Sequence, residues 1–244
     1  MDDNEPSNVP SAAEKARSKV GCFIACGLIG LCLVLVIGWC APSIRRMSHV
    51  GDQVVALNNG KTMALALNDF ATEYGSFPDR ETAAAVKKNT LTTLDLDGDT
   101  ANHYFRQLIA AGMIKSEESF YAKTAYSPRR PDNNMRGDQA LKPGEVGFGY
   151  IMNGTRALPA DNLNRVIAVT PLRNGSTTGE FDPNPLDGMA VLVLLDTSVK
   201  MVRIRKEDRQ VMLGDKKLLE NGADTVWGTA ITPVIKPPLG HQVQ

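Results

Sequence analysis

The sequence predicts an α+β protein in which an N-terminal transmembrane helix leads into a long amphipathic helix packed on a small antiparallel β-sheet. Three observations carry this prediction. Residues 20–41 contain no charged side chain, apolar residues then recur at helical spacing as far as Tyr74, and the last third holds short β-branched runs between turn residues. We expect a disordered N-terminal tail (1–19), the transmembrane helix (20–41), an α+β ectodomain (42–230) and a Pro-rich C-terminal tail (231–244).

The apolar stretch Val20–Ala41 lies between Lys19 on one side and Arg45 and Arg46 on the other. At ~1.5 Å per residue, a helix of this length crosses a hydrocarbon core of ~30 Å. The apolar core of a signal peptide is shorter, about 7–15 residues, so we expect an uncleaved anchor, with a removed signal as the alternative. More Lys and Arg residues flank the stretch on its N-terminal side, which favours a cytoplasmic N-terminus. The chain is then a single-pass protein of the cytoplasmic (inner) membrane with a periplasmic or extracellular C-terminal domain.

The segment after Pro42 has the pattern of a long amphipathic helix. Its apolar residues are spaced by three and four and form one stripe, at Val50, Val54, Leu57, Ala64, Leu67, Ala71 and Tyr74. We interpret this stripe as the face that packs on the rest of the ectodomain. Gly75 and Pro78 end the helix.

Three shorter helical segments follow, over Thr82–Lys88, Thr100–Ala111 and Glu117–Ala122. Asp99 or Thr100 is positioned to cap the second of these, and Gly112 lies just past its end. The segment from Thr124 to Glu145 is rich in Pro, Gly, Asn and charge, which predicts a long irregular connection.

The last third reads as strands joined by tight turns. The predicted strands are Val146–Met152, Val166–Thr170, Met189–Leu195 and Val199–Ile204, and the turn signals are Asn153-Gly154, Asn174-Gly175 and Asp187-Gly188. Asp196-Thr197-Ser198 joins the last two strands as a hairpin. The final stretch is too rich in Pro for a central strand, so we expect an extended tail.

This order of parts resembles the type IV pilin and type II secretion pseudopilin family, especially the major pseudopilins. The matching residues are Ala66-Leu67, the run Tyr74-Gly75-Ser76-Phe77-Pro78, and the hairpin from Asp187-Gly188-Met189-Ala190-Val191 to Asp196-Thr197-Ser198-Val199. The resemblance implies a pilin-like fold and a structural role in secretion or pilus assembly. The chain departs from the family's Gly-Phe-Thr-Leu-x-Glu cleavage motif, because Gly21 is followed by Cys22-Phe23-Ile24-Ala25-Cys26 and no acid lies in Val20–Ala41.

Composition and motifs argue against several other functions. The 27 basic and 27 acidic residues balance, whereas nucleic-acid binding calls for a clustered basic surface. All four cysteines fall within residues 20–41, so the ectodomain has no disulfide and no cysteine metal site. The sequence contains neither H-E-x-x-H nor G-x-S-x-G. We therefore expect no enzyme and no small-molecule substrate.

Asp95, Asp97 and Asp99 have the alternate spacing that opens an EF-hand calcium loop. The rest of that motif is missing, since Thr100 stands where Gly is required and Arg106 stands where the bidentate Glu should be. We expect no cofactor, and calcium on these three aspartates is the alternative.

Together these patterns predict a membrane-anchored, pseudopilin-like structural or assembly protein of a bacterial cell envelope. It would act through protein–protein contacts with other envelope or secretion-system proteins. The alternative is a membrane-tethered calcium- or ligand-binding domain, with an enzyme as the third choice.

Overall fold

The computed structural model describes residues 48–173 and 176–240. The chain divides into two units, Met1–Ser48 and His49–Gln244, and the following description concerns the second. The predicted N-terminal tail (1–19), the predicted transmembrane helix (20–41) and the Asn174-Gly175 turn lie outside the described residues.

The predicted fold class was wrong about its first element, the transmembrane helix. The described part is α+β, with a five-stranded antiparallel sheet as its centre. Among the helices of residues 48–173 and 176–240, we find none whose length and apolarity suit a membrane span. Even the longest, over residues 48–74, alternates buried and exposed positions along its length, as an amphipathic helix does.

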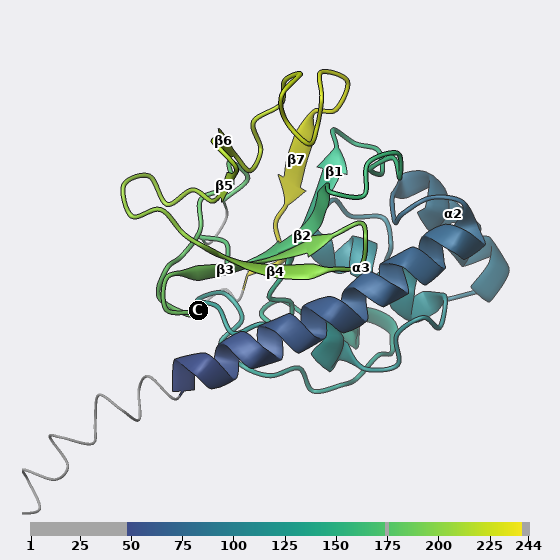
Figure 1. Cartoon of the computed structure of the whole chain (residues 1–244). Helices are drawn as coiled ribbons and strands as arrows, with labels where there is room; N and C mark the ends of the chain where they lie inside the picture. The colour runs from purple at the N-terminus through teal and green to yellow at the C-terminus, as the bar shows by residue number, and fades with distance from the viewer. Residues whose placement is uncertain (1–47, 174–175, 241–244) are drawn as a thin grey trace, which may run out of the picture. The chain divides into compact units, whose positions relative to one another are not determined.

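This long helix (residues 48–74) lies along the sheet in Figure 1, and most of the predicted stripe packs on the core. Its buried residues are Ala56, Gly60, Met63, Ala64, Ala66, Leu67 and Phe70. Val50 and Val54, predicted to face the core, are 52% and 49% exposed. The predicted stripe is therefore confirmed over its last five residues and wrong at the first two. Gly60 also belongs to the buried face, where its missing side chain lets the helix backbone approach Val193 and Val199.

Two further α-helices follow, α2 (Arg80–Thr90) and α3 (Ala101–Ala110). The carboxylate of Asp79 caps α2 by accepting hydrogen bonds from the first-turn backbone N–H groups. Thr100 is the N-cap residue of α3 but makes no side-chain capping bond, and the Asp99 carboxylate binds Tyr104 and Lys236 instead. The predicted side-chain cap of α3 was therefore wrong, whereas the predicted end at Gly112, with φ +74°, is confirmed.

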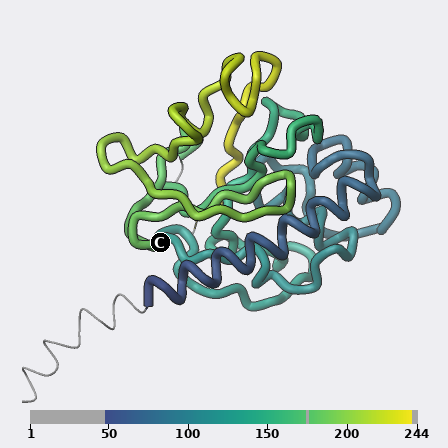
Figure 2. Tube along the Cα trace, viewed as in Figure 1, coloured from purple at the N-terminus to yellow at the C-terminus, as the bar shows by residue number. Residues whose placement is uncertain are grey.

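Two 3-10 turns, η1 (Glu117–Phe120) and η2 (Gly137–Gln139), lie between α3 and the sheet. We call residues 121–148 the long connection. In Figure 2 its teal trace runs beside the long helix. The contacts agree: Asn59 donates to the Tyr121 carbonyl at 2.8 Å, and Lys123 pairs with Asp52 at 2.9 Å.

The sheet has the order β4-β3-β2-β1-β7, and every neighbouring pair is antiparallel. Its strands are β1 (Gly149–Asn153), β2 (Val166–Thr170), β3 (Met189–Leu194), β4 (Val199–Arg203) and β7 (Pro233–Lys236). A separate small hairpin pairs β5 (Met212–Leu213) with β6 (Lys216–Lys217). The four predicted strands and the Asp196-Thr197-Ser198 hairpin are confirmed, with ends that differ by at most three residues.

Strand β7 lies in the segment predicted as a tail. Ile235 pairs with Ile151 of β1 and is fully buried. The strand lies at the sheet edge. A strand that contains Pro fits there because Pro has no backbone N–H to donate to a second neighbouring strand. Residues 231–240 therefore belong to the folded unit.

Aromatic side chains join α3 to the sheet. The ring of Tyr150 in β1 lies 5.3 Å from that of Tyr104 and 5.6 Å from that of Phe105, centroid to centroid. The Tyr150 hydroxyl donates to the Pro78 carbonyl at 2.9 Å. Trp227 is 1% exposed and donates from its indole nitrogen to the Leu218 carbonyl.

Candidate metal centre

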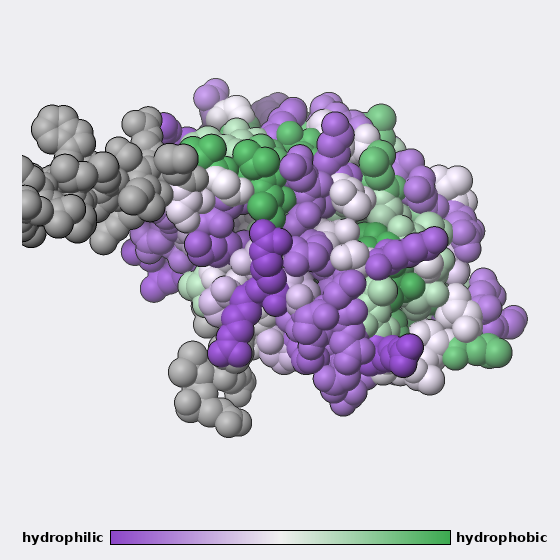
Figure 3. Space-filling view, turned by 90° about the horizontal axis from the view of Figure 1, so that it is seen from below, coloured by the Kyte–Doolittle hydropathy of each residue, from purple (hydrophilic) through white to green (hydrophobic). Residues whose placement is uncertain are grey.

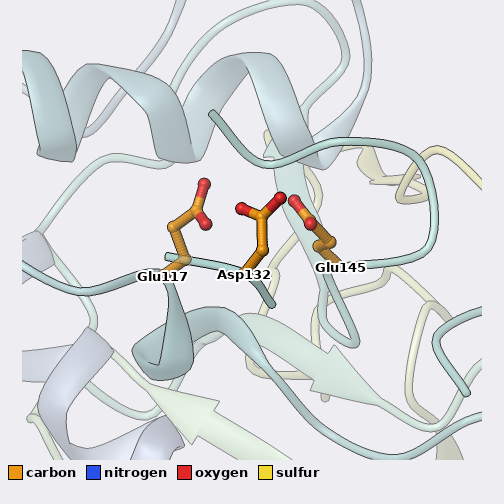
Figure 4. Close-up of side chains that lie close together, drawn as sticks. All are labelled: Glu117, Asp132 and Glu145. Atoms are coloured by element: carbon orange, nitrogen blue, oxygen red, sulfur yellow. The ribbon is translucent and has the colours of Figure 1, made fainter. Parts of the chain in front are cut away.

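The structure brings three acidic side chains together beside the long connection: Glu117, Asp132 and Glu145. One carboxylate oxygen from each lies within 4.8 Å of those of the other two. Figure 4 shows the three carboxylates facing a common space, with Asp132 between the two glutamates. We call these three residues the acidic cluster.

Glu117 is fixed in place by the turn that carries it. It is the first residue of η1, its backbone N–H donates to Asn133 Oδ1 at 2.9 Å, and its Oε1 accepts from the Leu141 backbone N–H at 2.6 Å. Its side chain is fully buried, yet Oε2 has no hydrogen-bond partner. Such an oxygen is costly in a protein interior, where nearly all polar groups are paired.

The other two carboxylates reach the cluster from the long connection. Asp132 accepts from the Asn134 backbone N–H at 2.9 Å through Oδ1 and from Lys142 Nζ at 2.5 Å through Oδ2. Glu145 Oε2 accepts from the Lys142 backbone N–H at 2.7 Å. These bonds fold the connection back on itself, so residues far apart in the sequence present oxygens to one point.

Arg106 of α3 holds the connection from the other side. This side chain is buried, and it donates to three backbone carbonyls: to Ala140 from Nε at 2.8 Å, to Leu141 from Nη2 at 3.3 Å and to Asp95 from Nη1 at 3.2 Å. Burial lowers the pKa of Arg106, while the carboxylates of Asp95 and Glu117 act in the opposite direction.

The electrostatics of the cluster disfavour ionisation of its most buried member. Burial raises the pKa of the Glu117 carboxyl, and the charges of Glu145 and Asp132 raise it further. The hydrogen bond from the Leu141 backbone N–H lowers the pKa but does not outweigh the other effects. A nearby cation would remove this penalty.

A cavity of about 330 Å³ opens beside the cluster. Asp132 and Glu145 line it together with Lys142, Arg129 and Arg130. The cavity has room for several water molecules, so an ion bound at the cluster could complete its coordination with water.

The three aspartates predicted from the sequence do not converge in this way. Asp97 pairs with Lys87 at 2.5 Å, Asp95 lies 3.4 Å from His103 Nε2, and Asp99 pairs with Lys236 at 2.8 Å. Within the described part of the chain, the carboxylates that gather closely enough for a shared ion are those of the acidic cluster, which includes none of these three.

Two of the three histidines lie among the described residues. His49 Nδ1 lies 3.2 Å from the Pro185 carbonyl oxygen. His103 lies between Thr100 Oγ1, at 2.7 Å, and Asp95. Thr100, His103 and Asp95 thus follow one another in the order nucleophile, base and acid, as in a catalytic triad. The imidazole, however, packs so closely on Gly98 that a β-carbon there would lie 2.1 Å from the ring, which indicates a packing role.

Sequence reasoning missed the acidic cluster because its members belong to no local motif. Glu117, Asp132 and Glu145 are far apart in the chain and meet only through the fold of the connection. The available signal was the length of that irregular segment, which is unusual in a compact domain unless the segment has a function.

Comparisons with models of known protein families, with curated proteins and with solved structures find no match to this chain.

Proposed function

We propose that this protein is a non-catalytic structural or assembly component of a bacterial cell envelope, related to the type IV pilins and pseudopilins. In this proposal the apolar stretch Val20–Ala41 attaches the chain to the cytoplasmic membrane, and the folded unit lies outside the cytoplasm. There it contacts other envelope or secretion-system proteins. The sequence resemblance and the uncharged stretch support the proposal.

The observation that carries the protein-contact role is the outward face of the long helix. Val50 and Val54 are about half exposed, and Leu65, 51% exposed, lies eleven residues after Val54, which places it about three turns further along the same side of the helix. Figure 3 shows that hydrophobic patches interrupt the hydrophilic surface on one face of the molecule. Exposed aliphatic residues on one side of a helix suit a contact with an apolar partner surface.

Site-specific photo-crosslinking in the native cell tests this role. A photoreactive residue at Val50 or Val54 should give one discrete adduct with an envelope protein, because the side chain would lie in an interface. The matched position is Glu73, an exposed residue near the other end of the same helix. Equal, diffuse labelling at Val54 and Glu73 would contradict the proposal.

Membrane attachment is tested separately. The full-length chain should remain with the membrane fraction after alkaline carbonate washing, and protease added outside the cytoplasmic membrane should cleave its C-terminal unit. Recovery of the chain in the wash supernatant would contradict attachment through Val20–Ala41.

A further inference from the structure

We propose that Glu117, Asp132 and Glu145 form a binding site for one calcium ion, which fastens the long connection to η1. This inference does not depend on the proposed assembly role, because it concerns a different part of the molecule.

The first argument is the unpartnered oxygen of Glu117. The side chain is fully buried and Oε1 is used by the Leu141 N–H, but Oε2 has no hydrogen bond. Figure 4 shows that the Glu117 carboxylate group lies beside that of Asp132. A fold that buries a carboxylate normally satisfies both oxygens. A cation between the three carboxylates would supply the missing partner.

The second argument is the spacing of the ligand atoms. The three oxygens lie within 4.8 Å of one another, so an ion placed between them would lie within about 2.8 Å of all three. Calcium–oxygen bonds measure about 2.3–2.6 Å, so small side-chain movements suffice. Calcium accepts oxygen ligands in a flexible geometry, whereas magnesium requires near-ideal octahedral geometry at about 2.0–2.1 Å. An irregular set of carboxylates with room for water therefore suits calcium better.

The third argument is charge. Once the Lys142 ammonium has left Asp132, three ionised carboxylates beside the positive charge of Arg106 leave two negative charges, which one divalent cation balances. Arg106 cannot approach the carboxylates more closely to balance them itself, because its guanidinium is held by the carbonyls of Ala140, Leu141 and Asp95.

Lys142 is the competitor for the site, since its ammonium binds Asp132 Oδ2. Its side chain is 32% exposed and the Asp132 side chain 48% exposed, and an ion pair of this exposure contributes little. The ammonium can therefore move into the cavity when calcium binds. A protonated Glu117 that donates to a neighbouring carboxylate is the other way to satisfy the cluster, and the experiment separates it from calcium.

The test is thermal unfolding of the purified full-length chain in detergent, first stripped with a chelator and then titrated with calcium chloride. We expect the midpoint to rise by about 5 °C or more once calcium exceeds its dissociation constant a hundredfold. Magnesium chloride at the same concentration should give a smaller rise.

The variant Asp132→Asn should abolish the response, and Glu117→Gln should do the same. The control is Asp97→Asn, because Asp97, like Asp132, is an exposed aspartate whose carboxylate lies 2.5 Å from a lysine ammonium. This control should keep the full response. Asp132 is on the surface, so its variant decides the question even if the Glu117 variant does not fold.

An unchanged midpoint in the wild-type chain would overturn the proposal and leave the shared proton as the explanation of the cluster. A response that survives in Asp132→Asn but disappears in Asp97→Asn would also overturn it, and would place calcium at the run Asp95, Asp97 and Asp99.

Discussion

A β-carbon added to Gly60 of the long helix would lie 3.2 Å from Cγ2 of Val193 in β3. Of the two glycines in this helix, Gly60 is thus the one at which the backbone lies close to the sheet. Gly51, in contrast, has no atom within 4 Å of the same added carbon.

The two glycines therefore predict opposite effects of one substitution. Gly60→Leu should lower the free energy of unfolding by about 1–3 kcal/mol, because the side chain must displace Val193 and Val199. Gly51→Leu should raise it by about 0.5–1 kcal/mol through helix propensity. Urea unfolding of both variants measures the difference, and equal effects would show that Gly60 is not a packing position.

The C-terminal strand predicts a sharp boundary for truncation. A chain ending at Ala230 should fail to fold, because it loses β7, the buried Ile235 and the Lys236–Asp99 ion pair. A chain ending at Gly240 should unfold at nearly the wild-type midpoint. If circular dichroism showed a cooperative transition for both chains, β7 would be dispensable.

The buried guanidinium of Arg106 should contribute strongly to stability through its hydrogen bonds to the backbone. Arg106→Met leaves the carbonyl of Ala140 without its side-chain donor and removes one of the donors to Leu141, which should cost about 2–4 kcal/mol. Arg130→Met removes a side chain that is 63% exposed and pairs with Glu118, and should change stability by less than about 0.5 kcal/mol. Chemical denaturation of the two variants provides the comparison.

The burial of Glu117 predicts that the stability of the folded chain depends on pH when a chelator is present. Burial raises the pKa of its carboxyl above the usual value of 4.5 in the folded state. At a pH between the pKa of the unfolded chain and that of the folded chain, the folded chain therefore keeps a proton that the unfolded chain has released. Stability therefore falls as pH rises through this window. Glu117→Gln removes this contribution, so the variant should gain stability relative to wild type as the pH rises above the usual carboxyl pKa of 4.5. A constant difference as the pH rises would show that Glu117 titrates normally.

The sequence predicted the elements of this fold better than their orientation. Strands such as Val166–Thr170 were located exactly, because β-branched runs bounded by turn residues are local signals. The predicted core face of the long helix was wrong at Val50 and Val54, which follow the apolar spacing but are about half exposed. The buried role of Gly60 could not be predicted either, because it depends on Val193 and Val199, more than a hundred residues further along the chain.

The acidic cluster was out of reach of sequence reasoning for a related reason. The alternate spacing of Asp95, Asp97 and Asp99 is a visible pattern, yet the fold gives each carboxylate its own partner. Glu117 and Glu145 show no pattern, and they meet because the connection is tied to Arg106 and to the backbone of Leu141 and Lys142.

The most direct test of the calcium site is hydrogen exchange at the Leu141 backbone amide, which donates to Glu117 Oε1. Calcium bound to the cluster would hold Glu117 ionised and the connection closed, so exchange at residues 141 and 142 should slow at least tenfold when calcium is added to the chelator-treated full-length chain. The amides of β3, which are far from the cluster in the chain, should exchange at nearly unchanged rates under native conditions. Identical exchange at Leu141 with and without calcium would contradict the account.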